Sequence, residues 1–190
     1  MPTYVIEHLE EKVWKWCLIE YMHIFRIVKK SHLLFTNIKW NNEKSTIKKY
    51  GAVTPKSVAE LKLRNVCVLD PAARKTLTPK EANRFDYFIF GGILGNFPAQ
   101  KRTTPELTSR LKNAAARNIG KKQMSTDTAV YVVKKIVEGK KLSDLAFQDK
   151  IEIGLGKNES TILPYRYIIL NKKPLISKEL VNYLKKKKGF

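Results

Sequence analysis

Phe88-Ile-Phe-Gly-Gly-Ile-Leu-Gly95 is the stretch that decides the fold of this chain. Its apolar first half is typical of a buried strand, and its glycines let the backbone come close to a ligand. A second stretch, Gly120-Lys-Lys-Gln-Met-Ser-Thr-Asp-Thr-Ala129, brings Ser, Thr and Asp to an expected helix start, where unpaired N–H groups gather. Together with Leu69-Asp70-Pro71 after a third apolar run, these loops predict one pocket at the carboxyl ends of neighbouring strands.

Apolar runs and turn residues predict the secondary structure around this pocket. The expected strands cover residues 4–6, 33–36, 65–69 and 86–90. The expected helices cover residues 12–30, a segment that starts at Thr78-Pro79, a segment from Pro105 to about Asn118, and a segment capped by Thr126. Strands that alternate with helices indicate an α/β fold with a mostly parallel sheet covered on both faces.

The length of 190 residues fits one domain with a sizeable core, so we expect residues 1–190 to form a single domain. Residues 151–190 are expected to be a C-terminal extension packed on it, with two strand-like pieces and a helix from Ser177. No apolar stretch reaches the ~20 residues of a membrane span. The beginning of the chain has no basic segment before an apolar core, so we expect no secretory signal, no membrane association and a cytoplasmic location.

Cysteine and histidine are sparse. Cys17 and Cys67 both lie inside apolar runs, which favours buried small side chains over a disulfide or a reactive thiol. Three histidines and no pair of cysteines at ligand spacing argue against a zinc site, so no metal is expected. Neither of the usual glycine-rich nucleotide-binding motifs is present, which disfavours a dinucleotide or P-loop site.

The net charge is +20, from 37 Lys and Arg against 17 Asp and Glu. Such a charge favours an anionic partner, and RNA or a ribonucleoprotein is the natural candidate. A Lys-rich proteome is the alternative explanation, but it predicts more glutamate than this chain contains.

Several blocks in this order resemble the SPOUT superfamily of S-adenosylmethionine (SAM) dependent methyltransferases. Within it, the chain is similar to the fungal and archaeal branch that includes a ribosomal-protein arginine methyltransferase, members of which have also been described as predicted RNA methyltransferases. The blocks that carry the resemblance are Ile6-Glu7-His8, Glu10-Glu11, Val68-Leu69-Asp70-Pro71, the segment 85–95, Arg102-Thr103, the segment 123–129, and Glu159-Ser160-Thr161 with Pro164, Arg166 and Tyr167. The resemblance implies a SPOUT-type sheet flanked by helices, with a deep C-terminal trefoil knot.

The resemblance also implies the cofactor and the residues that bind it. SAM is the expected cofactor, and the positions that the family motifs carry over are Leu69, Asp70, Pro71, Gly91, Gly92, Ile93, Gly95, Gln123, Met124, Ser125, Thr126 and Thr128. For the glycines, simple turn geometry is the alternative explanation. For Met124, core packing is as good an explanation as cofactor contact.

The candidates for catalysis depend on the acceptor. An arginine acceptor is cationic and needs carboxylates that orient its guanidinium, so the candidates are Glu7, Asp70, Asp127 and Glu159. An RNA hydroxyl needs a base or a cation, and Arg102 fits that role. Asp127 can equally be an N-terminal helix charge, Glu7 a surface ion pair, and Arg102 a clamp on an anion or a solvated loop side chain.

Three functions follow from these observations. The first is methylation of an arginine in a small-subunit ribosomal protein, and the second is methylation of rRNA or tRNA. The third is a SAM-binding ribosome-assembly factor without turnover. The expected partners are a ribosomal protein, the ribosome or RNA, and the chain is expected to be a monomer or a homodimer.

Overall fold

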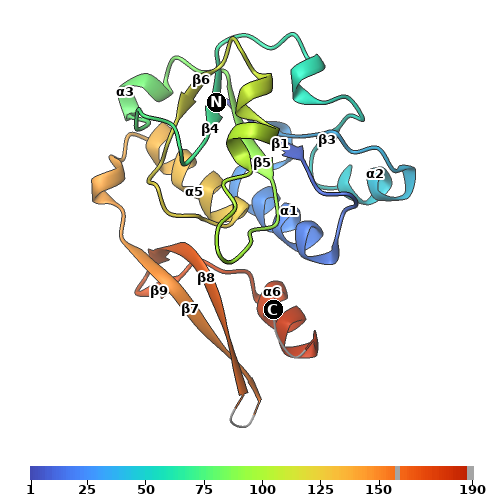
Figure 1. Ribbon diagram of the computed structural model, residues 1–190, viewed down its shortest axis with the longest axis vertical. Coiled ribbons are helices and arrows are strands. Elements are labelled where there is room, and N and C mark those ends of the chain that lie inside the picture. The colour runs from blue at the N-terminus through green and yellow to red at the C-terminus, as the bar shows by residue number, and fades with distance from the viewer. Residues whose placement is uncertain (157–158, 188–190) are drawn as a thin grey trace.

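The computed structural model describes residues 1–156 and 159–187 (Figure 1). Within these residues, parallel strands form a six-stranded sheet in the order β3-β2-β1-β5-β4-β6. Its strands are β1 Thr3–His8, β2 Leu33–Thr36, β3 Ala52–Val53, β4 Val66–Leu69, β5 Tyr87–Gly92 and β6 Ala115–Arg117. Because β5, β4 and β6 are consecutive parallel strands in this order, the loops that follow them leave the same edge of the sheet at neighbouring positions.

The helices connect these strands. The α-helices are α1 Lys15–Val28, α2 Asn41–Ile47, α3 Pro79–Ala82, α4 Thr103–Glu106, α5 Thr126–Val137 and α6 Lys178–Lys187. Short 3₁₀ turns complete the connections: η1 Lys30–His32, η2 Val58–Glu60, η3 Thr108–Arg110 and η4 Leu142–Asp144. The expected strands, the long first helix and the helix start at Thr78-Pro79 are therefore confirmed, with α1 shorter than expected at both ends.

Alternation along β5 explains how the sheet is covered. Phe88 and Phe90 face one side, where they belong to the large apolar core that includes residues of α1 and α5. Ile89 faces the other side, in a smaller core with Val58 of η2 and Leu107, which follows α4. One face of the sheet is thus covered by long helices, and the other by short helical turns.

A second, three-stranded antiparallel sheet begins at Phe147. It consists of β7 Phe147–Gly156, β8 Glu159–Leu170 and β9 Lys173–Pro174. Figure 1 shows the β7–β8 hairpin extending away from the main sheet, with α6 beside it. This C-terminal unit packs on the main domain, because Ile19 of α1 shares a core with Leu163 and Leu180, and Arg26 pairs with Glu179 at 2.7 Å. The last residues of the predicted extension, 188–190, lie outside the described part of the chain.

The helix predicted from Pro105 to Asn118 is wrong. This segment contains the end of α4, the turn η3 and the edge strand β6, whose residues pair with β4. The hydroxyls of Thr104 and Thr108 both donate to the Asp70 carboxylate at 2.7 Å, which holds the chain in short turns. A free sheet edge and a buried carboxylate therefore override the helix propensity of the alanine-rich run.

The start of α5 differs from the prediction by one residue. Ser125, not Thr126, has the extended backbone of the cap, and its hydroxyl donates to the Thr128 hydroxyl at 2.8 Å.

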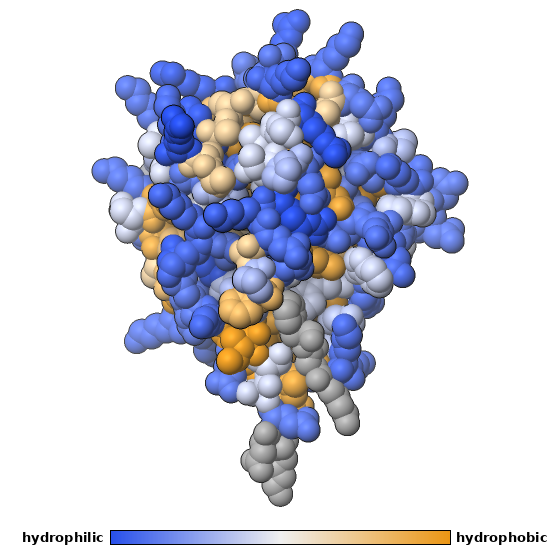
Figure 2. Space-filling view, in the orientation of Figure 1, coloured by the Kyte–Doolittle hydropathy of each residue, from blue (hydrophilic) through white to orange (hydrophobic). Residues whose placement is uncertain are grey.

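The trefoil knot that the resemblance implies stays a prediction. Among the described residues, no helix is long and apolar enough to cross a membrane. Figure 2 shows a mostly hydrophilic face, with apolar patches scattered between the hydrophilic side chains.

Glu7 is buried at the end of β1, with 1% of its surface exposed. Its carboxylate accepts hydrogen bonds from the Thr36 hydroxyl, from the Ser57 hydroxyl at 2.6 Å and from the Val58 N–H at 2.9 Å. These donors come from β2 and from η2, so the carboxylate joins the central strand to its neighbour and to the turn that covers the sheet. Glu7 is neither a surface ion pair nor turned toward the loops that follow β4 and β5.

Replacing Glu7 with alanine is therefore expected to destabilise the fold. Glu7→Ala leaves buried donors unsatisfied, which lowers the free energy of unfolding by about 3 kcal/mol. Chemical denaturation monitored by circular dichroism measures this change, with Glu11→Ala, an exposed neighbour, as the control. An unfolding free energy equal to that of the wild type contradicts the structural role.

Candidate active site

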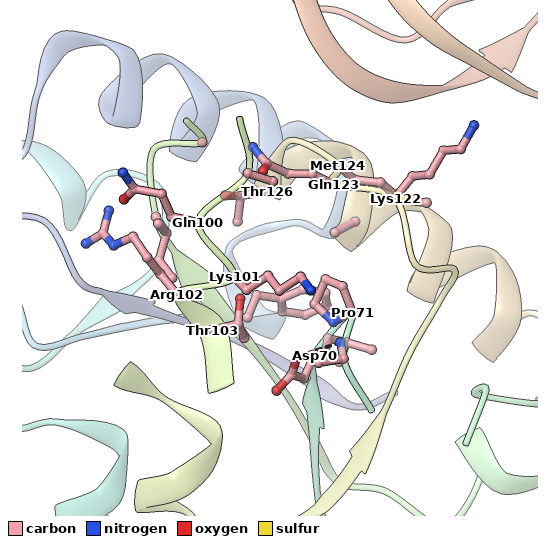
Figure 3. Close-up of a pocket in the computed structure, with 18 of the residues that line it drawn as sticks. Asp70, Pro71, Gln100, Lys101, Arg102, Thr103, Lys122, Gln123, Met124 and Thr126 are labelled. Carbon is pink, nitrogen blue, oxygen red and sulfur yellow. Dashed lines mark hydrogen bonds between the residues drawn. The ribbon is translucent and has the colours of Figure 1, made fainter. Parts of the chain in front are cut away.

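A cavity of about 490 Å³ opens at the carboxyl ends of β4, β5 and β6 (Figure 3). Its size is within the range of small-molecule sites, roughly 300–1,000 Å³. Three loops form its walls, and their lining residues are Leu69–Ala72, Phe90, Gly91, Ile93–Asn96, Ala99–Thr103, Ile119–Met124, Thr126 and Ala129. The topology therefore brings the glycine stretch and the Ser-Thr-Asp stretch together around one cavity at the predicted edge of the sheet.

Asp70 lies at the floor of this cavity, at the end of β4, and is almost fully buried. One carboxylate oxygen accepts from the Ala72 N–H at 2.8 Å, and the other accepts from the two threonine hydroxyls described above. These bonds use both oxygens to fix the loop after β4 and the turns around α4. Asp70 shapes the cavity wall by holding these segments.

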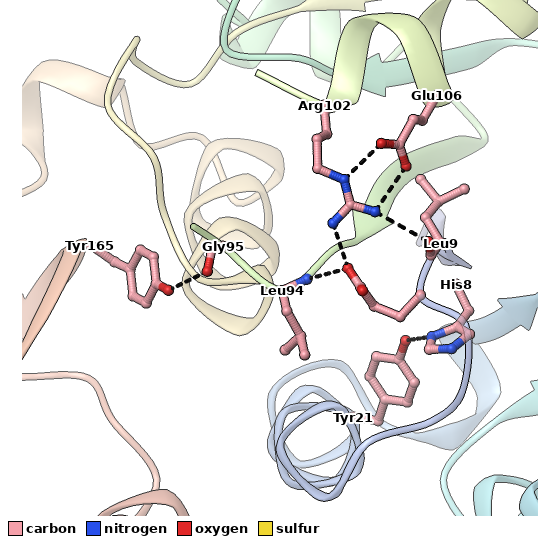
Figure 4. Close-up of polar contacts among 9 residues, drawn as sticks. His8, Leu9, Tyr21, Leu94, Gly95, Arg102, Glu106 and Tyr165 are labelled. Carbon is pink, nitrogen blue, oxygen red and sulfur yellow. Dashed lines mark hydrogen bonds and ion pairs between the residues drawn. The ribbon is translucent and has the colours of Figure 1, made fainter. Parts of the chain in front are cut away.

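Arg102 lies at the rim of the cavity and is held by two carboxylates (Figure 4). Its guanidinium forms a bidentate pair with Glu106, with distances of 2.7 and 3.1 Å, and contacts Glu10 at 2.8 Å. The same Glu10 oxygen accepts from the Leu94 N–H at 2.9 Å, so Glu10 ties the glycine loop to the following segment. Arg102 is therefore a structural clamp of the loop between β5 and α4.

Gly95 lies where three segments meet. A Cβ atom at this position would lie 2.0 Å from Nε2 of Gln123 and 2.5 Å from Cε1 of Tyr165. The Tyr165 hydroxyl of β8 also donates to the Gly95 carbonyl at 2.8 Å (Figure 4). A side chain at position 95 would require the Gln123 and Tyr165 side chains to shift, at the point where the loop after β5, the loop before α5 and the C-terminal sheet meet.

A second cavity, of about 250 Å³, lies on the other side of the glycine loop. It is lined by Trp16 and Glu20 of α1, Tyr165 of β8, Tyr183 and Lys187 of α6, Ser125, and five residues that also line the first cavity: Ile93, Leu94, Gly95, Asn96 and Met124. The two cavities are thus neighbours across one shared wall.

Glu20 is the acidic residue of this second cavity, and only 6% of its surface is exposed. The Trp16 indole N–H donates to one of its carboxylate oxygens at 2.9 Å. Burial raises the pKa of Glu20 to about 8, and the nearby charge of Asp127 adds to the effect. Asp127 itself accepts from the N–H of Thr128 and lies 2.6 Å from the His23 Nδ1 nitrogen.

Comparison with known proteins gives the family of this fold and site. The family model described as protein arginine N-methyltransferase SFM1-like matches residues 3–189. The protein arginine N-methyltransferase SFM1 of Saccharomyces cerevisiae is 33% identical over 200 residues, which cover 96% of this chain and 94% of that protein. The chain belongs to the SFM1-like family of protein arginine N-methyltransferases. The expected resemblance is thereby confirmed.

Solved structures agree with this SFM1-like assignment. The yeast arginine methyltransferase SFM1 complexed with SAM matches with a TM-score of 0.89 at 32% identity, covering 98% of this chain and 91% of that chain. Its complex with SAH matches with a TM-score of 0.86 at 31% identity, covering 96% of this chain and 94% of that one. The dual-specific Trm10 of Thermococcus kodakaraensis, 20% identical, matches with a TM-score of 0.61 over 76% of this chain and 96% of that chain, which confirms the SPOUT-type fold alone.

The structure gathers most of the predicted cofactor residues around the first cavity. Those that line it are Leu69, Asp70, Pro71, Gly91, Ile93, Gly95, Gln123, Met124 and Thr126. The others lie elsewhere: Gly92 packs against the Tyr21 hydroxyl, Ser125 lines the second cavity, and Thr128 is buried inside the start of α5. All twelve assignments stay predictions of cofactor contact.

The predicted catalytic residues are dispersed. Asp70 and Arg102 line the first cavity, whereas Glu7 lies beneath the turn η2 and Asp127 is turned toward His23 of α1. Glu159 begins β8, is exposed, and pairs in the ladder with Gly156 at the far end of the hairpin. The structure therefore does not bring the four carboxylates together.

Sequence reasoning missed Glu10 and Glu20. Glu10 belongs to a quoted family block, but its bonds to Leu94 and Arg102 span more than 80 residues and leave no local signal. Glu20 occupies a polar step of an amphipathic helix, where a solvated side chain is the ordinary expectation. Lys101 and Lys122 also line the first cavity; Lys122 lies within the quoted stretch 120–129, but neither lysine was singled out as a site residue.

Burial of Glu20 predicts a pH-dependent cost to stability. In the unfolded chain this carboxyl ionises near its usual pKa of 4.5, and in the folded chain only near pH 8. The folded state therefore holds the Glu20 proton more tightly than the unfolded chain does. Protonation of Glu20 stabilises the fold fully below pH 4.5, and this stabilisation is lost as the pH rises to about 8. Glutamine cannot ionise, so Glu20→Gln should raise the melting temperature relative to wild type more at pH 8 than at pH 4.5.

Differential scanning calorimetry at the two pH values measures this difference, and Glu138→Gln is the matched control. Glu138 follows α5 at the end opposite the cavities, and its ion pairs with Lys134 and Lys135 lower its pKa. An equal shift in melting temperature at both pH values for Glu20→Gln contradicts the raised pKa.

Proposed function

We propose that this chain is a SAM-dependent protein arginine methyltransferase that modifies an arginine of a small-subunit ribosomal protein in the cytoplasm. The observation that carries the proposal is the match of residues 3–189 to the SFM1-like family, together with a cavity formed by the loops that carry the family motifs. Yeast SFM1, which has been solved with SAM, SAH and MTA, has the same fold over nearly the whole chain.

The first cavity is suited to SAM. Gly91 and Gly95 carry no side chain, so main-chain groups of the glycine loop can reach the cavity directly. Leu69, Pro71, Ile119 and Met124 supply apolar surface for the adenine, and Lys101 and Lys122 are cations for the amino-acid carboxylate. Figure 3 shows Lys101 extending across the cavity toward Pro71. When bound, SAM supplies a methyl group activated by its sulfonium.

The charge of the protein supports a ribosomal partner. A net charge of +20 attracts the chain to ribosomal RNA, while the modified group belongs to a protein presented near it. The same charge is the specific observation that favours the second candidate, an RNA methyltransferase. The structural likeness to Trm10 carries only the fold and does not favour an RNA acceptor.

Substituting Gly95 tests the cofactor site. In Gly95→Ala the new methyl group overlaps Gln123 and Tyr165, so the wall must shift and SAM affinity should fall by roughly tenfold or more. Isothermal titration calorimetry measures the affinity. Gly154→Ala is the matched control, because a Cβ there meets no atom within 4 Å. Equal SAM affinity in Gly95→Ala and wild type contradicts the assignment of this cavity.

Labelled methyl transfer tests the acceptor. The purified chain is incubated with methyl-labelled SAM and with small ribosomal subunits that lack this modification, and protein and RNA are then separated and counted. The proposal predicts label in one small-subunit protein, released as methylarginine after acid hydrolysis.

Two other results would contradict the proposal in different ways. Label in the RNA fraction that resists protease makes the chain an RNA methyltransferase. SAM binding without transfer to either fraction makes it a binding factor of ribosome assembly.

A further inference from the structure

We infer that the second cavity is the binding site for the acceptor arginine, with Glu20 as the carboxylate partner of its guanidinium. The inference rests on the proposed arginine methyltransferase function and assigns the acceptor subsite within it. It also replaces the carboxylates that the family motifs suggest with one that lies outside those motifs.

The lining of the cavity has the chemistry that a guanidinium requires. Trp16, Tyr165 and Tyr183 supply aromatic surface, on which the planar, delocalised arginine cation stacks well. Glu20 supplies one buried carboxylate, which a guanidinium can meet with paired N–H groups. Lys187 also lines the cavity, but it is exposed, and its long stem lets the ammonium stay in water.

The position of the cavity is that of an acceptor site. It shares a wall of five residues with the first cavity, so a side chain there lies beside the cofactor site. Its other walls come from α1, β8 and α6, which means that the C-terminal unit completes it. Methyl transfer needs the acceptor and the methyl group in contact and aligned, and neighbouring cavities provide this arrangement.

The other candidate carboxylates are engaged in the fold. Glu7 accepts from β2 and η2, Asp70 accepts from Ala72 and two threonines, and Asp127 faces His23. Glu159 is exposed at the far end of the hairpin. Glu20 also accepts a hydrogen bond, from the Trp16 indole N–H at 2.9 Å, but among these buried carboxylates it is the one that lines the second cavity.

The energetics of Glu20 favour a cationic ligand. Desolvation and the charge of Asp127 disfavour its ionised form in the protein alone. A guanidinium held against the carboxylate reverses this effect, because an opposite charge favours ionisation. A buried acid that costs stability without its ligand is typical of a functional site.

The transfer step balances within this site. A bond forms between a guanidinium nitrogen and the methyl carbon while the bond between that carbon and the sulfonium sulfur breaks. The sulfur keeps the electron pair and leaves as the thioether of SAH. The nitrogen loses one proton, which passes to the ionised Glu20 carboxylate and from there to water.

A binding experiment tests the site without turnover. The probe is Nα-acetyl-arginine methylamide, and its neutral isostere Nα-acetyl-citrulline methylamide is the control ligand. Both are titrated into the full-length protein with SAH, and the Trp16 indole N–H is followed by nitrogen-15 NMR. The chain has three tryptophans, so Trp16→Phe assigns the signal.

The expected result is a saturable shift of the Trp16 signal with the arginine probe and none with citrulline. Glu20→Gln should weaken arginine binding by roughly tenfold or more, while its SAH affinity stays within a factor of about two. Absence of a Trp16 shift in wild type, or an equal affinity in Glu20→Gln, overturns the inference.

A kinetic experiment separates this inference from the proposed function. With unmodified small subunits, Glu20→Gln should reduce kcat/KM for methyl transfer by roughly a hundredfold or more, with KM for SAM unchanged. Glu138→Gln should equal wild type. If wild type methylates no arginine, the proposed function itself fails. If wild type does so and Glu20→Gln matches it, only the acceptor site is wrong.

Discussion

The contact of Gly95 with Tyr165 and Gln123 is the constraint on which the site depends. At this point the loop after β5 touches the loop before α5 and the C-terminal sheet, and the tyrosine hydroxyl donates to the Gly95 carbonyl. Both cavities have Gly95 in their walls. A side chain at position 95 would push the Gln123 and Tyr165 side chains away from the glycine loop. The small size of Gly95 therefore keeps the cofactor cavity and the proposed acceptor cavity next to each other.

Buried carboxylates explain how the remaining loops are positioned. Glu7 joins β1 to β2 and η2, Asp70 fixes the turns around α4, and Glu10 ties the glycine loop to Arg102. Each accepts several charge-assisted hydrogen bonds from segments far apart in the chain. Burial raises the pKa of Glu20, and a guanidinium bound beside it in the second cavity would favour its ionised form.

Local signals carried the predictable part of the structure. A few adjacent residues determine some elements, and these could be predicted from the sequence. They are the apolar strand before Gly91, the start of α3 at Thr78-Pro79 and the polar start of α5. Strand β6 could not be predicted, because its conformation depends on pairing with β4 and on the hydrogen bonds that Asp70 accepts from the preceding turns. The second cavity also lay beyond prediction, because α1, β8 and α6 meet there only in the folded chain.

The most direct test of the two-cavity site is a crystal structure of the protein with SAH and Nα-acetyl-arginine methylamide. We expect SAH in the cavity at the ends of β4, β5 and β6, and the guanidinium in the neighbouring cavity, within hydrogen-bonding distance of the Glu20 carboxylate. A guanidinium bound against Asp70 or on the outer surface, with the second cavity closed by protein side chains, would contradict this assignment.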